Sequence, residues 1–407
     1  MASLCAFGPI VLAMAASSVR AGVPAASFGE DLTFLRQHTS VVVLGSRHGR
    51  SQIAVAPDWQ GRVMTSSADG AAGVSFGWIN RKLIASGEQL PHFNPLGGED
   101  RVWLGPEGGQ FSIYFAKGAP FDLEHWFVPK PFDTLPFELT QESQSSVTLA
   151  SRFQLTDYSG TQFTVSLTRT VSVIEPRSAW KHLGLHEVEG VSLVAYESRN
   201  TLTNAGERAW TKDTGLLSIW ILGMFNPSPK ATIVIPIRPG PEAELGKVVT
   251  SDYFGSIPAE RLQVTDRTVL LKGDGQFRSK VGVNPRRSLG KLGSYDAAHH
   301  VLTIVQFDQP RAATDYVNSL WKIQSNPFAG DAANAYNDGP PAPGKPPMGP
   351  FYELESSSPA AALAPGGHLT HTHRTFHFVG NPDRLDAIAR AVLGVSLAAI
   401  EAGFGAK

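Results

Sequence analysis

The chain has 407 residues, of which 42% are hydrophobic and 17% are charged, a composition typical of a globular protein with a sizeable core. Its 35 basic and 36 acidic residues give a formal net charge of -1, so no overall field attracts nucleic acid or an anionic membrane surface. We therefore expect no nucleic-acid partner, and we expect any charged ligand to be recognised locally.

The chain begins with an apolar run that is followed by small residues up to Ala21. This order is typical of a secretory signal, so we predict that residues 1–21 are removed and that the mature protein, residues 22–407, is periplasmic or secreted. The alternative is an apolar N-terminus that is retained. The only cysteine, Cys5, lies in this segment, which excludes disulfides and cysteine chemistry from a cleaved chain. No later apolar run is long enough to span a bilayer, so we expect no membrane insertion.

The segment SFGEDLTFLRQHT, residues 27–39, has apolar residues at helical spacing after a good N-cap residue, Ser27, and predicts one short helix. From Ser40 to about Phe378 the pattern changes to short runs of alternating apolar and polar residues, separated by Gly, Pro, Asn and Asp. The clearest predicted strands are QIAVAP, FSIYFA, SVTLASRFQLT, QFTVSLTRTVSVI, KATIVIPIRP, RTVLLKG and HVLTIVQFDQ. Many strands and few helical stretches predict a single all-β domain, and the lack of a fixed repeat argues against a propeller or solenoid.

Two features follow near the C-terminus. Residues 326–350 are dense in Pro and Gly and predict a long loop, in which Tyr336, Asn337 and Asp338 are available for contacts. Residues 382–402 have an amphipathic helical pattern, and we expect this helix to pack on the β body.

The stretch from residue 351 to residue 378 combines glutamates with histidines. Strand alternation places Glu353 and Glu355 on one face of a strand, and His371 and His373 on one face of the next. If these strands are neighbours, carboxylates and imidazoles meet on one surface. Three interpretations stay open: an acid-base sugar site, a metal site shared by the two histidines and a carboxylate, and a polar strand that faces solvent.

A second polar cluster lies within residues 77–115. Its candidate ligand-binding residues are Arg81, His92, Arg101, Trp103 and Glu107. A tryptophan offers a flat apolar face to a sugar ring, and arginines and carboxylates pair with hydroxyl groups. The alternative is a turn-rich edge in which Asp100 and Arg101 form a structural ion pair.

Several motifs resemble those of one known family. GWINRKLIASG followed by FNPLGG is similar to the Asn-Arg and Gly-Gly segments of aldose 1-epimerases, which belong to the galactose mutarotase-like superfamily. LTNAGERAW and ELESSSPAAALAPGG resemble later motifs of that family and occur in the same order. The resemblance implies an antiparallel β-supersandwich with short helices at the two ends of the chain and a concave face that binds carbohydrate.

The resemblance also implies roles for individual residues. Glu355 stands at the position of the family's catalytic base, and Asn80 and Arg81 stand at its sugar-binding Asn-Arg pair. Two departures accompany these matches: Leu96 replaces a family histidine, and TKDTGLLSIWILGMF lacks the histidine that serves as general acid. Mutarotation needs an acid as well as a base.

We therefore expect a secreted, sugar-active enzyme without a cofactor. Glu355 is the predicted base, His371 or His373 is the predicted acid, and Glu353 is predicted to stay outside the chemistry. The two clusters are predicted to converge on one cleft. The alternatives are a non-catalytic carbohydrate-binding module and a metal-assisted glycan lyase or hydrolase. The chain has no phosphate-binding glycine loop and no GxSxG motif, and its sequence indicates no oligomeric state.

Overall fold

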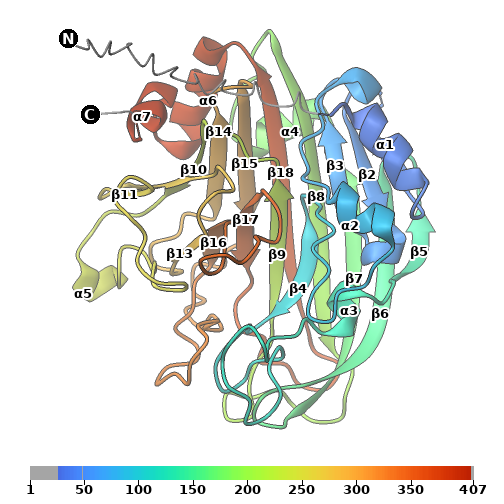
Figure 1. Ribbon diagram of the computed structural model, residues 1–407, viewed down its shortest axis with the longest axis vertical. Coiled ribbons are helices and arrows are strands. Elements are labelled where there is room, and N and C mark those ends of the chain that lie inside the picture. The colour runs from blue at the N-terminus through green and yellow to red at the C-terminus, as the bar shows by residue number, and fades with distance from the viewer. Residues whose placement is uncertain (1–25, 48, 405–407) are drawn as a thin grey trace, which may run out of the picture.

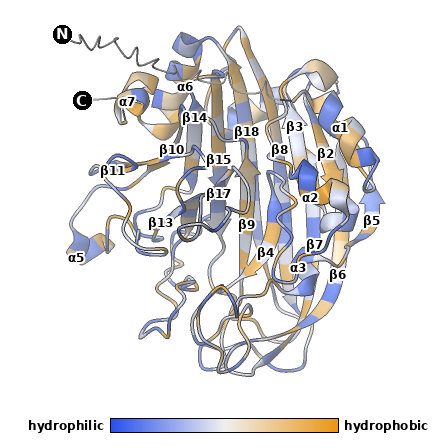
Figure 2. Cartoon of the chain, viewed as in Figure 1, coloured by the Kyte–Doolittle hydropathy of each residue, from blue (hydrophilic) through white to orange (hydrophobic). Residues whose placement is uncertain are grey.

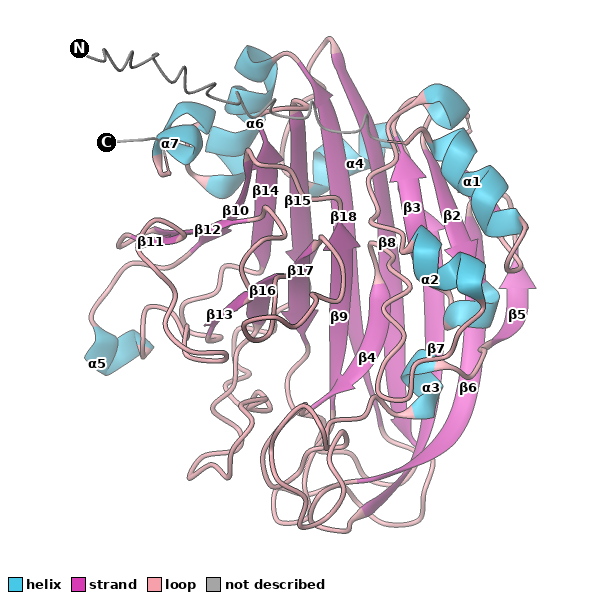
Figure 3. Ribbon diagram, in the orientation of Figure 1, coloured by secondary structure: helices cyan, strands magenta, loops and turns pink. Residues whose placement is uncertain are grey.

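The computed structural model in Figure 1 describes residues 26–47 and 49–404. In these residues the strands form three antiparallel sheets, and the helices are short and lie around them (Figure 3). The predicted all-β, antiparallel fold is confirmed. The predicted signal, residues 1–21, lies outside the described residues, and no described helix has the length and apolar character needed to cross a membrane.

The largest sheet has ten strands. In spatial order they are β11 (Leu262–Val264), β12 (Thr268–Lys272), β10 (Ala231–Pro236), β14 (Lys291–Asp296), β15 (Val301–Phe307), β18 (His368–Gly380), β8 (Val191–Asn204), β7 (Gln162–Val173), β6 (Ser146–Thr156) and β5 (Glu138–Glu142). Its long central strands have the alternating pattern from which the sequence predicted them.

A five-stranded sheet packs against it. Its spatial order is β13 (Ser279–Val283), β16 (Ala333–Asn337), β17 (Tyr352–Ser357), β9 (Ser218–Phe225) and β4 (Arg101–Gly105). The third sheet consists of β1 (Val42–Gly45), β2 (Gln52–Ala56) and β3 (Arg62–Ser67).

Seven short α-helices accompany the sheets in the described residues. They are α1 (Phe28–Arg36), α2 (Arg81–Ser86), α3 (Lys130–Asp133), α4 (Pro176–His182), α5 (Glu242–Leu245), α6 (Pro382–Leu393) and α7 (Leu397–Ala402). Helix α1 packs on the three-stranded sheet, while α4, α6 and α7 share a hydrophobic cluster with the outer face of the ten-stranded sheet.

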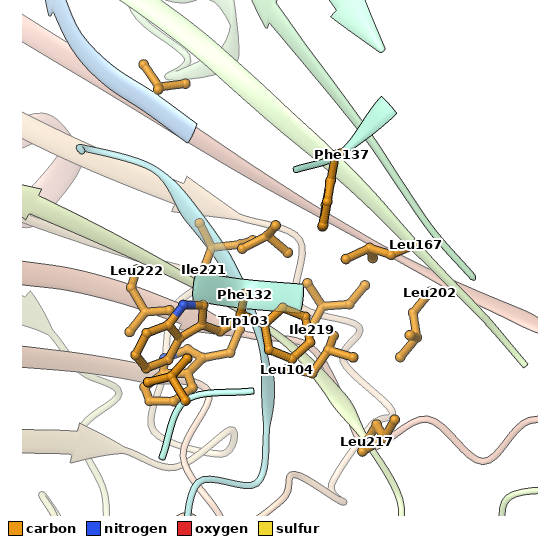
Figure 4. Packing of buried hydrophobic residues seen from close by; sticks show 14 of the residues in the cluster. Trp103, Leu104, Phe132, Phe137, Leu167, Leu202, Leu217, Ile219, Ile221 and Leu222 are labelled. Atoms are coloured by element: carbon orange, nitrogen blue, oxygen red, sulfur yellow. The ribbon is translucent and has the colours of Figure 1, made fainter. Parts of the chain in front are cut away.

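The inner faces of the two large sheets form the core. Ile219 and Ile221 of β9 lie in one buried cluster with Leu167 of β7 and Leu202 of β8 (Figure 4). Successive residues of a strand point to opposite faces of its sheet. The residues between these apolar positions therefore point away from the core and form the other face of the five-stranded sheet.

The space between the sheets also holds polar pairs, and hydrophilic segments are visible within the long central strands (Figure 2). Arg169 donates to Asp100 at 2.6 Å, and Glu99 lies 2.7 Å from the ring of His377. All four side chains are buried. Asp100 therefore pairs with Arg169, and the alternative of an Asp100–Arg101 ion pair is wrong.

Three expectations about single elements need comment. Helix α1 has the predicted N-cap, Ser27, whose side chain accepts from the backbone of Glu30. The predicted C-terminal helix is two helices, because Gly394 ends α6 with a left-handed backbone, at a φ of 73°. Residues 326–350 are not one loop, since β16 lies within them, and FSIYFA forms turns instead of a strand.

Candidate functional site

The outer face of the five-stranded sheet is the floor of the candidate site. Paired residues of neighbouring strands share a face, and the register places Lys280, Tyr336 and Glu353 in one row across β13, β16 and β17. In the next row, Glu355 and Arg101 each pair with Leu222 of β9. Charged residues that are distant in sequence are thus gathered on one surface.

Loops close over this floor and form a cavity with a volume of about 70 Å³. Its walls are rich in aromatic side chains, which include Phe93, Trp103, Trp126, Trp220, Phe254, Trp321 and Tyr336. Its charged lining residues are Arg101, Glu107, Arg278, Lys280 and Glu353. This volume is that of about two or three waters, so the cavity fits one end of a ligand and not a long chain.

Glu355 lies beneath the cavity and is fully buried. Its Oε2 accepts from the indole of Trp220 at 2.8 Å and lies 3.1 Å from Nζ of Lys280. Burial acts to lower the pKa of Lys280, but Glu355 and Glu107 raise it above its ordinary value. The ammonium group of Lys280 therefore stays charged, and it lies 4.5 Å from the ring centre of Trp220.

Glu353 lines the cavity itself and forms an ion pair with Arg101. Burial raises the pKa of Glu353; Arg101 opposes this rise, and Glu355 adds to it. Burial also raises the pKa of Glu107, where Lys280 opposes the rise. Both cavity-lining carboxyl groups thus hold a proton more readily than an exposed glutamate does.

His371 and His373 lie on the opposite side of β17. Both rings hydrogen-bond to the hydroxyl of Ser356 at 2.8 Å, and Ser356 points toward the ten-stranded sheet, away from Glu355. Burial and the neighbouring His373 lower the pKa of His371 to about 3, and burial lowers the pKa of His373 to about 4. The expectation that they face Glu355 across one cleft is wrong, because adjacent residues of a strand point to opposite faces.

The residues of the second cluster divide into two groups. Arg101, Trp103 and Glu107 line the cavity. His92 is not among the lining residues; its ring bonds to the carbonyl of Trp126, which does line the cavity, at 2.8 Å.

Asn80 and Arg81 lie elsewhere. Asn80 caps α2 by accepting from the backbone of Leu83, and Arg81 pairs with Asp31 at 2.5 Å in a separate cleft. The predicted convergence of the two clusters on one cleft is therefore wrong for Arg81, as it is for His371 and His373, whereas Arg101 and Glu107 line the same cavity as Glu353.

Sequence reasoning missed Lys280, Arg278 and Trp220. The segment FRSKVGV contained a usable signal, because its two cations alternate with Ser279 and Val281, the pattern of a strand with one charged and one buried face. Within residues 26–47 and 49–404, no group of three or more His, Cys, Asp or Glu side chains is arranged to hold a metal ion.

Together, the fold and the site define an all-β protein of three antiparallel sheets, in which the outer face of the five-stranded sheet carries a tryptophan-rich cavity with paired acidic and basic groups. The chain belongs to the Family of unknown function (DUF6786), whose model matches residues 26–404. A comparison with curated proteins gave no match.

Solved structures with the same kind of fold are similar to this chain. A putative aldose 1-epimerase from Escherichia coli K12 has 13% sequence identity and a TM-score of 0.47, over 84% of this chain and 99% of that chain. A galactose mutarotase-like protein from Lactobacillus casei ATCC 334 has 11% identity and a TM-score of 0.46, over 83% of this chain and 100% of that chain. The names of these two proteins are those of the family and superfamily whose motifs the sequence resembles.

Proposed function

We propose that the protein is an exported, carbohydrate-active enzyme that performs acid-base chemistry on the end of a sugar or glycan bound in this cavity. The observation that carries the proposal is the presence of two buried carboxyl groups, Glu353 and Glu107, in a cavity walled by tryptophans. Aromatic faces suit the apolar faces of sugar rings, and buried carboxyl groups with raised pKa values suit proton transfer near neutral pH.

In this proposal, Glu353 exchanges a proton with the ligand. It lines the cavity, whereas Glu355 lies beneath and is bonded to Lys280 and Trp220. Glu355 then acts as a positioning residue that keeps Lys280 charged and holds the indole of Trp220. This assignment differs from the one that the family resemblance implies, in which Glu355 is the base.

The test begins with a search for turnover. Free sugars and oligosaccharides are mixed with the protein, and proton NMR follows anomeric exchange, cleavage and the formation of unsaturated product. The variants Glu353→Gln and Glu355→Gln are then compared at equal folded fraction. Loss of a proton-transferring group typically lowers the rate by about a hundredfold to ten-thousandfold.

We expect this loss of reaction rate in Glu353→Gln. A larger loss in Glu355→Gln, at equal folded fraction, would return the role of base to Glu355. If a sugar binds to the wild-type protein but none is converted, the protein is a carbohydrate-binding module.

A further inference from the structure

Hydrogen-bond donors without acceptors surround the cavity. Among the described residues, Nε and Nη1 of Arg101 have no partner, and neither have the indole nitrogens of Trp103 and Trp126. The three side chains are at least nine-tenths buried and line the cavity. A buried donor without an acceptor is unfavourable, so the cavity is suited to a group that accepts several hydrogen bonds.

Arg278 adds a positive charge that forms no ion pair within the described residues, although it lies near enough to Asp338 and Glu107 to oppose the rise that burial causes in the pKa of both. Its guanidinium carbon lies 3.7 Å from the ring centre of Phe254, and no carboxylate of the described residues lies within ion-pair distance of it. The other two cations that line the cavity are already engaged, since Arg101 pairs with Glu353 and Lys280 pairs with Glu355.

The remaining cavity carboxyl group forms no ion pair with Arg278. Glu107 pairs with no cation in the part of the chain that the structure describes, and burial raises its pKa against the opposing effects of Lys280 and Arg278. The wall at Arg278 therefore favours an anionic group on the ligand.

We infer that the ligand is an acidic sugar, a uronic acid at the end of a glycan or free, and that Arg278 binds its carboxylate. This inference rests on the proposed function and names its substrate class. A carboxylate accepts hydrogen bonds and donates none, it matches the planar fork of a guanidinium group, and it is small enough for the enclosed volume. A neutral hydroxymethyl group at the same position would form no ion pair with Arg278.

The test compares sugars that differ only at this group. Binding of glucose and glucuronate, and of galactose and galacturonate, is measured by calorimetry with the full mature chain. The methyl ester of each uronate and the corresponding 6-phosphate are included. We expect each uronate to bind at least about tenfold more tightly than its neutral partner, and each methyl ester to bind like the neutral sugar.

The variants Arg278→Gln and Arg278→Lys connect this preference to one residue. We expect Arg278→Gln to remove the preference for uronates and Arg278→Lys to retain part of it, and circular dichroism checks that both are folded. The ester comparison needs no variant, so it decides the question even if Arg278→Gln does not fold.

The outcomes separate the inference from the proposed function. Equal binding of neutral and acidic sugars would overturn the acidic-sugar inference and leave the proposed function in place. Tighter binding of the 6-phosphates than of the uronates would also overturn it. Failure of every sugar to bind would contradict the proposed function itself.

Discussion

The ion pair of Lys280 and Glu355 allows a quantitative prediction. The side chain of Lys280 is 6% exposed and that of Glu355 is fully buried, with Nζ and Oε2 separated by 3.1 Å. The change Glu355→Gln keeps an oxygen for the indole of Trp220 but removes the charge opposite Lys280. Removing one partner of a buried ion pair typically lowers the free energy of unfolding by about 3 to 5 kcal/mol.

We expect a loss near the lower end, about 3 kcal/mol, because the ammonium group of Lys280 keeps its contact with the ring of Trp220, 4.5 Å from the ring centre. Urea unfolding at pH 7 measures the difference. The matched control is Asp315→Asn, which removes the partner of Lys212 at 2.7 Å from a pair whose side chains are 56% and 48% exposed. Exposed pairs contribute less than about 1 kcal/mol.

The reasoning would be refuted if Glu355→Gln and Asp315→Asn lowered the free energy of unfolding equally. A second arm replaces both partners with apolar residues, as Lys280→Met with Glu355→Leu. Replacing a whole buried pair is often close to neutral, so we expect this double variant to be more stable than Glu355→Gln alone. If the double variant were less stable, the ion pair would contribute more than its burial costs.

Three further predictions concern other parts of the chain. The pKa values of His371 and His373 are about 3 and about 4, below the ordinary value of 6.5. The two neutral rings therefore contribute fully to stability above pH 6.5, and this contribution is lost as the pH falls toward 4 and 3. Urea unfolding between pH 7 and pH 4 should show this loss, and a double change of both residues to Gln should flatten it. Gly97→Ala should lower the free energy of unfolding by about 2 kcal/mol or more, because φ is 102° and a Cβ would lie 2.0 Å from a backbone oxygen. Gly87 also has a positive φ but faces open space, so Gly87→Ala should lower it by about 1 kcal/mol only. N-terminal sequencing of the native protein should find a chain that begins after Ala21, and an intact first residue would contradict the proposed export.

Alternation along single strands was predictable from the sequence. It placed Glu353 with Glu355 on one face, and His371 with His373 on another, and both assignments are correct. It did not reveal that these two faces point in opposite directions relative to the core. That outcome depends on which sheet each strand joins, and β17 and β18, although consecutive, belong to different sheets.

Composition was a weaker guide in the Pro-rich region. Pro and Gly indicated a loop across residues 326–350, yet Tyr336 lies in a strand and lines the cavity. Pairing with β13 and β17 on both sides stabilises β16 despite its flanks. Such long-range pairing overrides local propensity and cannot be inferred from a window of sequence.

The floor of the cavity has a consequence for when the protein becomes functional. Arg101 and Glu353 are 252 residues apart in the chain, and the strands that carry them meet only through β9. Contacts over such separations form late, because the entropy of closing the intervening loops is lost before the contact contributes. A growing or partly folded chain therefore has no complete cavity until β17 is in place. Ligand binding then reports the end of folding. A chain exported before folding would acquire its site only at its destination.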